Sequence, residues 1–274
     1  MIGIQLLAKY KDVVVKPRAR DYLIDGEKYQ RVTSAISIIN KPALIPWAKR
    51  ITLERVGAIL LNPSVSQELA ALAGEAPEVY GKFVQRLLVD AGKAADNERD
   101  AKADLGTEAH AIIHTALALS PDDIPGCIDR LTVEQQPAVR GALAFLRDFN
   151  ITVLDAEVVV WNDVLQVAGT IDGVGTIGDG LVIWDWKRSA GIYWETALQL
   201  AAYATLLAGI TGLPVLRAFA VRLPRTPAES YDCKQLDASA LLSAFILYQN
   251  AFFLHRGRGK ELWVNGNGEG NGSE

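Results

Sequence analysis

Three consecutive β-branched, apolar segments between residues 153 and 187 constrain the fold more than any other part of this sequence. They read VLDAEVVVW (153–161), VLQVAGTIDGVGTI (164–177) and LVIWDWK (181–187). Short polar stretches, Asn162-Asp163 and Gly178-Asp179-Gly180, separate them, and such stretches form the tight turns that join neighbouring antiparallel strands. The sequence therefore predicts a three-stranded antiparallel meander.

Helical patterns surround this meander. We expect helices at 104–119 and 132–150 before it and at 194–210 and 238–255 after it, with further strands at 215–223 and near 230–235. Upstream, 10–32 reads as a β-hairpin turning at Asp25-Gly26, and helices are expected within 33–40, 46–61 and 64–103, the last stretch broken in two near Gly74–Pro77. This order predicts an α/β (α+β) fold with a central mixed β-sheet flanked by helices.

The predicted elements divide the chain into three parts. Residues 1–103 form an N-terminal hairpin and helical lobe, 104–260 form the core, and the glycine-rich tail 261–274 is expected to be disordered. A chain of 274 residues is long enough for one such core with an elaborated lobe.

Composition excludes several classes of protein. Half the residues are hydrophobic and 22% are charged, as in ordinary globular proteins. No apolar run approaches the roughly 20 residues of a membrane span, and the N-terminal lysines follow the short apolar stretch instead of preceding it, so we expect a cytoplasmic protein without a membrane partner. Cys127 and Cys233 are too few for a disulfide framework or a cysteine-ligated zinc or iron–sulfur site.

Charge is distributed unevenly along the chain. The net charge is −4, but residues 1–55 carry 11 Lys/Arg against 5 Asp/Glu, and residues 56–216 carry 10 against 21. Residues 217–260 are basic again, with 7 against 3. Such asymmetry fits a basic rim that follows phosphates beside an acidic metal pocket, and it fits a solvated surface of uneven composition equally well.

The segment IWDWK contains the first chemical signal. Side chains alternate along a strand, so Ile183, Asp185 and Lys187 share one face while Trp184 and Trp186 point to the other. A carboxylate and an ammonium group among apolar neighbours are costly unless they are paired or bind a metal. An ordinary ion pair at a strand end is the alternative interpretation.

Asp172 strengthens the chemical interpretation. It lies on the preceding strand, and Asp172 and Asp185 are each about six residues from the Gly178–Gly180 turn, so they should be neighbours across the two strands. Neighbouring carboxylates repel unless a divalent cation lies between them. Glycines at 169, 173 and 175 are expected to leave space there for a metal or a phosphodiester backbone.

These groups match the needs of phosphodiester hydrolysis. Hard oxygen ligands hold Mg²⁺ or Mn²⁺, which activates water and neutralises the phosphate. A lysine can orient or deprotonate that water, or stabilise the developing negative charge. Asp172, Asp185 and Lys187 supply this minimum set.

Four further polar residues are candidates for the same site. Gln199 and Tyr203 are spaced i, i+4 on an otherwise apolar helix, so they face either a site or polar partners in the core. His110 is a candidate metal ligand, whereas His114 fits packing or an outer position, since a zinc site would need a third nitrogen or sulfur ligand. Glu157 is either a further ligand or outer-shell group, or a solvated strand residue.

In this order the motifs resemble a known family, the RecB-like branch of the PD-(D/E)xK nucleases. The resemblance rests on GTEAH (106–110), Glu157, GTIDG (169–173), DWK (185–187) and QLAAY (199–203), and it covers about residues 30–210. The segment VTSAISIINKPALIPWAKR also resembles the opening helices of phage members. The resemblance implies a restriction-endonuclease-like core at 104–260 with an N-terminal helical lobe.

The resemblance also implies roles for individual residues. His110, Asp172 and Asp185 would bind the metal, Lys187 would be the catalytic lysine, and Gln199 and Tyr203 would support the active site or contact DNA. The strict Pro-Asp dipeptide is absent, because Ile171 precedes Asp172. The four cysteines of the iron–sulfur members and a GxxxxGK[ST] phosphate loop are also absent, so neither a cluster nor ATP is expected.

The expected function is that of a Mg²⁺- or Mn²⁺-dependent DNA exonuclease in recombination, repair or replication, phage-encoded and acting on single-stranded DNA or DNA with free ends. Partners would include a recombination or single-strand-binding protein. A structure-specific endonuclease and an inactive nucleic-acid-binding protein are the alternatives. Candidates for binding the DNA backbone and stacking on a base are Lys49, Arg50, Arg55, Arg256, Arg258, Lys260 and Trp47, for which solvated surface and core packing are the alternative roles.

Overall fold

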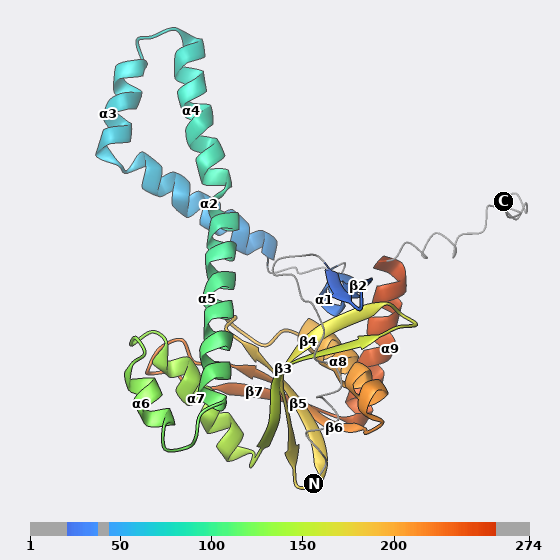
Figure 1. Cartoon of the computed structure of the whole chain (residues 1–274). Helices are drawn as coiled ribbons and strands as arrows, with labels where there is room; N and C mark the ends of the chain where they lie inside the picture. The colour runs from blue at the N-terminus through green and yellow to red at the C-terminus, as the bar shows by residue number, and fades with distance from the viewer. Residues whose placement is uncertain (1–20, 38–43, 256–274) are drawn as a thin grey trace, which may run out of the picture. The chain divides into compact units, whose positions relative to one another are not determined.

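The computed structural model describes residues 21–37 and 44–255 (Figure 1). The chain forms two compact units. The sheet unit comprises Met1–Ile39 and Glu108–Glu274, and the helical unit comprises Asn40–Thr107. The long helix α5 (Ala94–Leu117) contributes residues to both units.

A seven-stranded mixed sheet forms the centre of the sheet unit, in the order β1-β2-β4-β5-β6-β7 with β3 paired to β4. Its strands are β1 (Asp21–Ile24), β2 (Glu27–Arg31), β3 (Thr152–Asn162), β4 (Val167–Ile177), β5 (Gly180–Lys187), β6 (Val215–Arg222) and β7 (Asp232–Asp237). β3, β4 and β5 form the predicted antiparallel meander, and β5 pairs with β6 in parallel. The predicted α/β fold with a helix-flanked mixed sheet is confirmed.

β4 has an interrupted edge. β3 occupies one edge of β4 along nearly its whole length, from Val167 to Thr176. On the other edge, β5 pairs only with residues 173–177 and β2 only with Val167 and Ala168. Residues 169–172 therefore have no strand partner on that edge among the described residues, and Asp172 lies at the end of this gap.

Helices cover the sheet on both faces (Figure 1). α8 (Glu195–Thr211), α9 (Ala238–His255) and the short α1 (Val32–Ile36) share one apolar cluster with Ile171 and Ile183 of the sheet. α5, α6 (Ile124–Asp129) and α7 (Gln136–Asp148) share the other with Trp184 and Trp186. The predicted alternation along IWDWK is therefore observed.

The helical unit contains α2 (Leu44–Leu60), α3 (Pro63–Leu72), α4 (Pro77–Gly92) and the first part of α5. Its small core is built on Ile51, Ile59, Phe83 and Ala91. α5 begins at Ala94, ten residues before the predicted start at Asp104, because the alanine-rich and charged residues between them are good helix formers.

The N-terminal hairpin also differs from its predicted place. The sequence grouped it with the helical lobe, but β2 pairs in parallel with β4, and the Gln30 N–H donates to Gln166 O at 2.8 Å. Pairing between segments more than 130 residues apart leaves no local signal in the sequence. The predicted tail at 261–274 lies outside the described residues.

α9 is long and apolar enough to cross a membrane by length and composition alone. Its Leu241, Ala244, Tyr248 and Phe252 are buried in the cluster shared with α8, whereas 28% of the helix as a whole is buried. Among the described helices no other meets that criterion.

The glycines of β4 make room for aromatic side chains, which corrects the expectation of space for a ligand. A Cβ at Gly169 would lie 2.3 Å from the Tyr203 ring, and a Cβ at Gly173 would lie 2.0 Å from the Trp184 indole. A Cβ at Gly175 would meet Thr152 O at 2.6 Å. Glycine at these positions is therefore a requirement of packing.

We predict that Gly173→Ala lowers the free energy of unfolding by about 1–3 kcal/mol, the usual effect of overpacking a core. Urea unfolding measures this change. Gly191→Ala is the control, because nothing lies within 4 Å of the added methyl group. Its effect should stay within about 0.5 kcal/mol, and equal losses in both variants would contradict the packing argument.

Candidate active site

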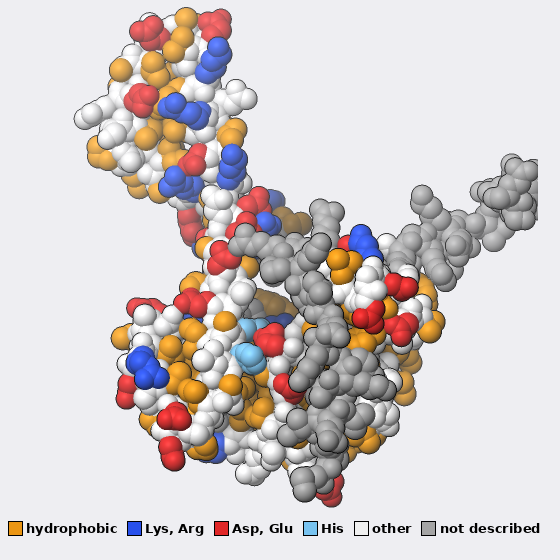
Figure 2. Space-filling model, viewed as in Figure 1, with side chains coloured by type: hydrophobic (Ala, Val, Ile, Leu, Met, Phe, Trp, Pro, Cys, Tyr) orange, Lys and Arg blue, Asp and Glu red, His pale blue; other side chains and the backbone are white. Residues whose placement is uncertain are grey.

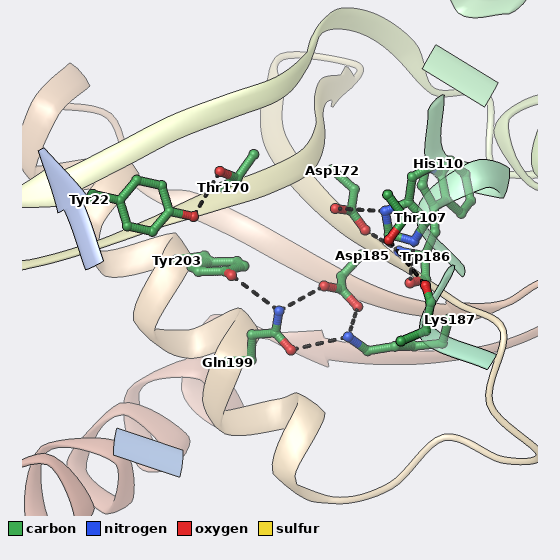
Figure 3. A network of polar contacts seen from close by, with 11 residues as sticks. Tyr22, Thr107, His110, Thr170, Asp172, Asp185, Trp186, Lys187, Gln199 and Tyr203 are labelled. Atoms are coloured by element: carbon green, nitrogen blue, oxygen red, sulfur yellow. Dashed lines mark hydrogen bonds and ion pairs between the residues drawn. The ribbon is translucent and has the colours of Figure 1, made fainter. Parts of the chain in front are cut away.

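Four elements bring polar side chains together at the gap in β4. β4 supplies Asp172, β5 supplies Asp185 and Lys187, α5 supplies His110, and α8 supplies Gln199 and Tyr203 (Figure 3). Figure 2 shows histidine side chains next to acidic side chains on the surface of the sheet unit that faces the viewer.

Asp172 takes the place of a backbone partner where β4 and β5 separate. The last residue pair of the two strands is Gly173 with Trp184. Beyond it, the Trp186 N–H donates to Asp172 Oδ2 at 2.6 Å. Asp172 is only 9% exposed, so this bond both fixes the carboxylate and satisfies a buried backbone donor.

His110 presents its Nδ1 to the other oxygen of Asp172. Its Nε2 lies 3.1 Å from Trp186 O, and because a carbonyl only accepts, Nε2 carries a hydrogen. Nδ1 then lies 3.4 Å from Asp172 Oδ1. Burial lowers the pKa of His110, but the hydrogen bond to Asp172 and the charges of Asp172, Asp185 and Glu157 outweigh it and raise the pKa to about 9.

Glu157 joins this pair from β3. Its backbone has φ +54°, in the left-handed region that costs a non-glycine residue about 1–3 kcal/mol. Glu157 lies between the residue pairs Ala156–Gly173 and Val158–Ile171, opposite Asp172. One ligand atom from each of His110, Glu157 and Asp172 lies within 4.8 Å of the others. Burial, followed by the charge of Asp172, raises the pKa of Glu157.

A second polar cluster surrounds Asp185, which is 2% exposed. Lys187 Nζ lies 2.6 Å from Asp185 Oδ2 and donates to Gln199 Oε1 at 3.1 Å. Gln199 Nε2 donates to Asp185 Oδ1 at 2.9 Å and to Tyr203 OH at 3.1 Å. Every polar atom of Gln199 thus has a role in fixing its neighbours, as Figure 3 shows.

Electrostatic shifts connect the two clusters. Burial raises the pKa of Asp185, the Lys187 charge opposes this, Asp172 adds to it, and the result is about 6. Burial lowers the pKa of Lys187, but the Asp185 charge and hydrogen bond outweigh it, so the pKa of Lys187 is raised. Because Asp172 contributes to both shifts, the clusters lie in one electrostatic environment.

The donor set fits a hard divalent cation. Carboxylate oxygens of Asp172 and Glu157 and the Nδ1 of His110 converge, and the carboxylate of Asp185 lies in the same electrostatic environment. Oxygen-rich sites of this kind suit Mg²⁺ and Mn²⁺, whereas structural zinc sites use mainly sulfur and nitrogen. The site is therefore a candidate acidic metal-binding site.

The structure distributes the predicted site residues unevenly. His110 and Asp172 lie close to one another together with Glu157, for which the sequence analysis left a ligand, an outer-shell and a solvated role open. Asp185, a predicted ligand, is held by Lys187 and Gln199. The left-handed backbone of Glu157 has no local signal in the sequence. The assignment of Asp185 as a metal ligand stays a prediction, and Glu157 is a second candidate for that role.

His114 lies outside the inner group. It is exposed on α5, one turn beyond His110, and its charge lowers the pKa of Glu157. An outer position for His114 stays a prediction.

The candidate DNA-binding residues of α2 belong to the helical unit. Two of the arginines already have acidic partners: Arg50 pairs with Glu54 at 2.6 Å, and Arg55 pairs with Asp90 at 2.7 Å. The Lys102 ammonium lies 5.4 Å from the centre of the Trp47 ring. Residues 40–107 carry nine Lys/Arg and nine Asp/Glu, so this unit is not a basic surface. A role in DNA binding for these residues and for Lys49 stays a prediction, and Arg256, Arg258 and Lys260 lie outside the described residues.

Comparisons with known proteins do not assign this chain to a family. No family model and no curated protein matches the sequence. Among solved structures, an alkaline exonuclease (LHK-Exo) from Laribacter hongkongensis matches with TM-score 0.29 and 9% identity over 57% of this chain and 93% of its own. A second solved structure, SSO0001, matches with TM-score 0.27 and 13% identity, and the match covers 91% of this chain and 83% of SSO0001. Likenesses this weak establish neither fold nor function.

We predict that metal affinity rises with pH, because a cation must replace the proton on His110 Nδ1. Below the His110 pKa of about 9, the affinity for Mn²⁺ should rise by up to about tenfold per pH unit between pH 6 and 8. Titration calorimetry in two buffers of different ionisation enthalpy would measure the proton released. In His110→Ala this dependence should flatten above pH 7, and an unchanged slope there would exclude His110 as the titrating ligand.

Proposed function

We propose that this chain is a divalent-metal-dependent nuclease that hydrolyses phosphodiester bonds in DNA. The observation that carries the proposal is the position of a His110–Glu157–Asp172 ligand group beside a buried Asp185–Lys187 pair. We further propose exonuclease action on single strands or free ends, in recombination, repair or replication of a phage in the host cytoplasm. A recombination or single-strand-binding protein would be its partner.

Asp172 would hold the metal, together with His110 and with Glu157 or Asp185. A bound Mg²⁺ or Mn²⁺ supplies an acidified water and neutralises charge on the scissile phosphate. The protein residues provide the fixed geometry: the Trp186 N–H locks one oxygen of Asp172, and the Trp186 carbonyl fixes the ring of His110. Such second contacts orient ligands before the substrate arrives.

Lys187 would act as a cation and not as a base. Its pKa is raised, so the ammonium form predominates at neutral pH. Held by Asp185 and Gln199, Nζ can donate a hydrogen bond to the attacking water or to a phosphate oxygen that gains negative charge. Proton abstraction from the water would then fall to another group or to solvent.

Gln199 would be a positioning residue. Its amide oxygen accepts from Lys187 while its amide nitrogen donates to Asp185 and Tyr203. It therefore fixes the separation of the cation and the carboxylate on β5. Tyr203, packed against Gly169, in turn limits the rotamers open to Gln199.

We predict that Lys187→Met reduces the rate of DNA cleavage by about 10²–10⁴-fold, because it removes the ammonium group and keeps most of the apolar stem. Asp172→Asn should have a similar effect and should also weaken Mn²⁺ binding. Cleavage would be followed on end-labelled DNA, with circular dichroism to verify folding. Lys234→Met on β7, whose Nζ donates to Ile192 O, is the control and should keep its activity. A folded, fully active Lys187→Met protein would remove the lysine from the mechanism.

A substrate panel tests the function itself. We expect linear single- or double-stranded DNA to be degraded with Mg²⁺ or Mn²⁺ and to survive with chelator. Cutting of closed circular single strands would identify an endonuclease instead. Binding of DNA without cleavage under any metal would identify an inactive binding protein, and the nuclease proposal would fail.

A further inference from the structure

Arg31, at the end of β2, is a cation without an anionic partner among the described residues. Its Nε is buried and has no hydrogen-bond partner there, and its guanidinium carbon lies 5.5 Å from the centre of the Tyr22 ring. The neighbouring carboxylates are already engaged: Asp21 pairs with Lys28 at 2.7 Å, and Asp163 accepts from Tyr29 at 2.7 Å. A partly buried charge in this situation is costly unless an anion completes it.

Arg31 shares a face of the sheet with the candidate metal ligands. On β4, Ala168 and Thr170 alternate with Gly169, whose added Cβ would meet Tyr203 of α8. Asp172 contacts His110 of α5, a helix that packs on the face opposite α8. Arg31 pairs with Ala168 across the two strands.

Tyr22 continues this face on the next strand of the hairpin. Its hydroxyl group lies 3.0 Å from Thr170 Oγ1 (Figure 3), and Tyr22 and Ala168 belong to one apolar cluster. The row from Arg31 through Tyr22 and Thr170 thus ends at Asp172.

The spacing along this row suits a nucleic-acid strand. Asp172 lies four residue steps along β4 from Ala168, which is about 13 Å at roughly 3.3 Å per residue. A strand of DNA advances about 3.4 Å per nucleotide along a duplex, so a few nucleotides bridge this length. Guanidinium groups bind phosphate oxygens through two parallel hydrogen bonds, and stacking on Tyr22 holds the plane of the group.

We propose that Arg31, supported by Tyr22, binds a backbone phosphate of the DNA strand a few nucleotides away from the scissile bond. This inference rests on the proposed nuclease function for the identity of the ligand. It assigns the hairpin, which the sequence grouped with the helical lobe, a direct part in substrate binding. The contact carries no base specificity, because only the backbone is bound.

DNA binding in the presence of chelator tests this proposal without requiring catalysis. The affinity of the full chain for a fluorescein-labelled single-stranded oligonucleotide would be measured by anisotropy between 50 and 200 mM salt. Arg31→Gln should weaken binding by about tenfold at the lower salt and reduce the loss of affinity over this range by about threefold, as expected for one lost phosphate contact. Arg31→Lys, which keeps the charge, should retain the salt dependence and bind more weakly than the unaltered protein.

Arg140→Gln on α7 is the matched control, because Arg140 is exposed, belongs to the same unit and lies on a helix whose apolar cluster contains no residue of β2. Equal effects of Arg31→Gln and Arg140→Gln, or no effect of Arg31→Gln, would overturn the proposal. If Arg31→Gln fails to fold, Arg31→Lys is the deciding variant. A DNA affinity equal to that of the unaltered protein would then contradict binding of the phosphate by two hydrogen bonds from the guanidinium group. If the protein does not cleave DNA but its DNA affinity depends on Arg31, the nuclease function alone is refuted. If it cleaves DNA but the Arg31 variants bind DNA as the unaltered protein does, this phosphate site alone is refuted.

Discussion

The hydrogen bond from the Trp186 N–H to Asp172 is the constraint on which the site depends. Strands β4 and β5 separate beyond Gly173 and Trp184, and separation would leave a buried backbone donor unsatisfied. The carboxylate of Asp172 satisfies that donor and is fixed by it. The Trp186 carbonyl then fixes His110 in the same way, so one residue of β5 orients two candidate ligands.

Charge balance explains why this arrangement favours a cation. Asp172, Asp185 and Glu157 place three carboxylates near one ammonium and one imidazole, and the pKa values of His110, Asp185 and Glu157 are all raised as a result of burial or negative neighbours. The site without a metal therefore retains protons. A divalent cation would replace those protons. Asp185, one of the groups that retains a proton, is also the ion-pair partner of Lys187, so metal binding and the charge around Lys187 are coupled.

Sequence patterns that are local predicted the centre of the site, and non-local geometry supplied the rest. Alternation along IWDWK and the distance from the Gly178–Gly180 turn were enough to bring Asp172, Asp185 and Lys187 into one environment. The strained backbone of Glu157 and the pairing of the hairpin with β4 depend on contacts between distant segments, so no spacing rule could reveal them. The glycines of β4 were misinterpreted because a sequence does not show which side chain fills the space they leave.

The gap in β4 connects these observations. Because β2 and β5 share one edge of β4 without meeting, residues 169–172 are open to groups from both faces of the sheet. Tyr203 enters from the α8 side against Gly169, and Tyr22 approaches Thr170 from the other (Figure 3). A continuous sheet would separate the Gln199–Lys187 cluster from the face that carries Arg31 and Asp172. In the mechanism proposed above, the interruption would allow one nucleic-acid strand to contact Lys187, the candidate metal ligands and the hairpin at once.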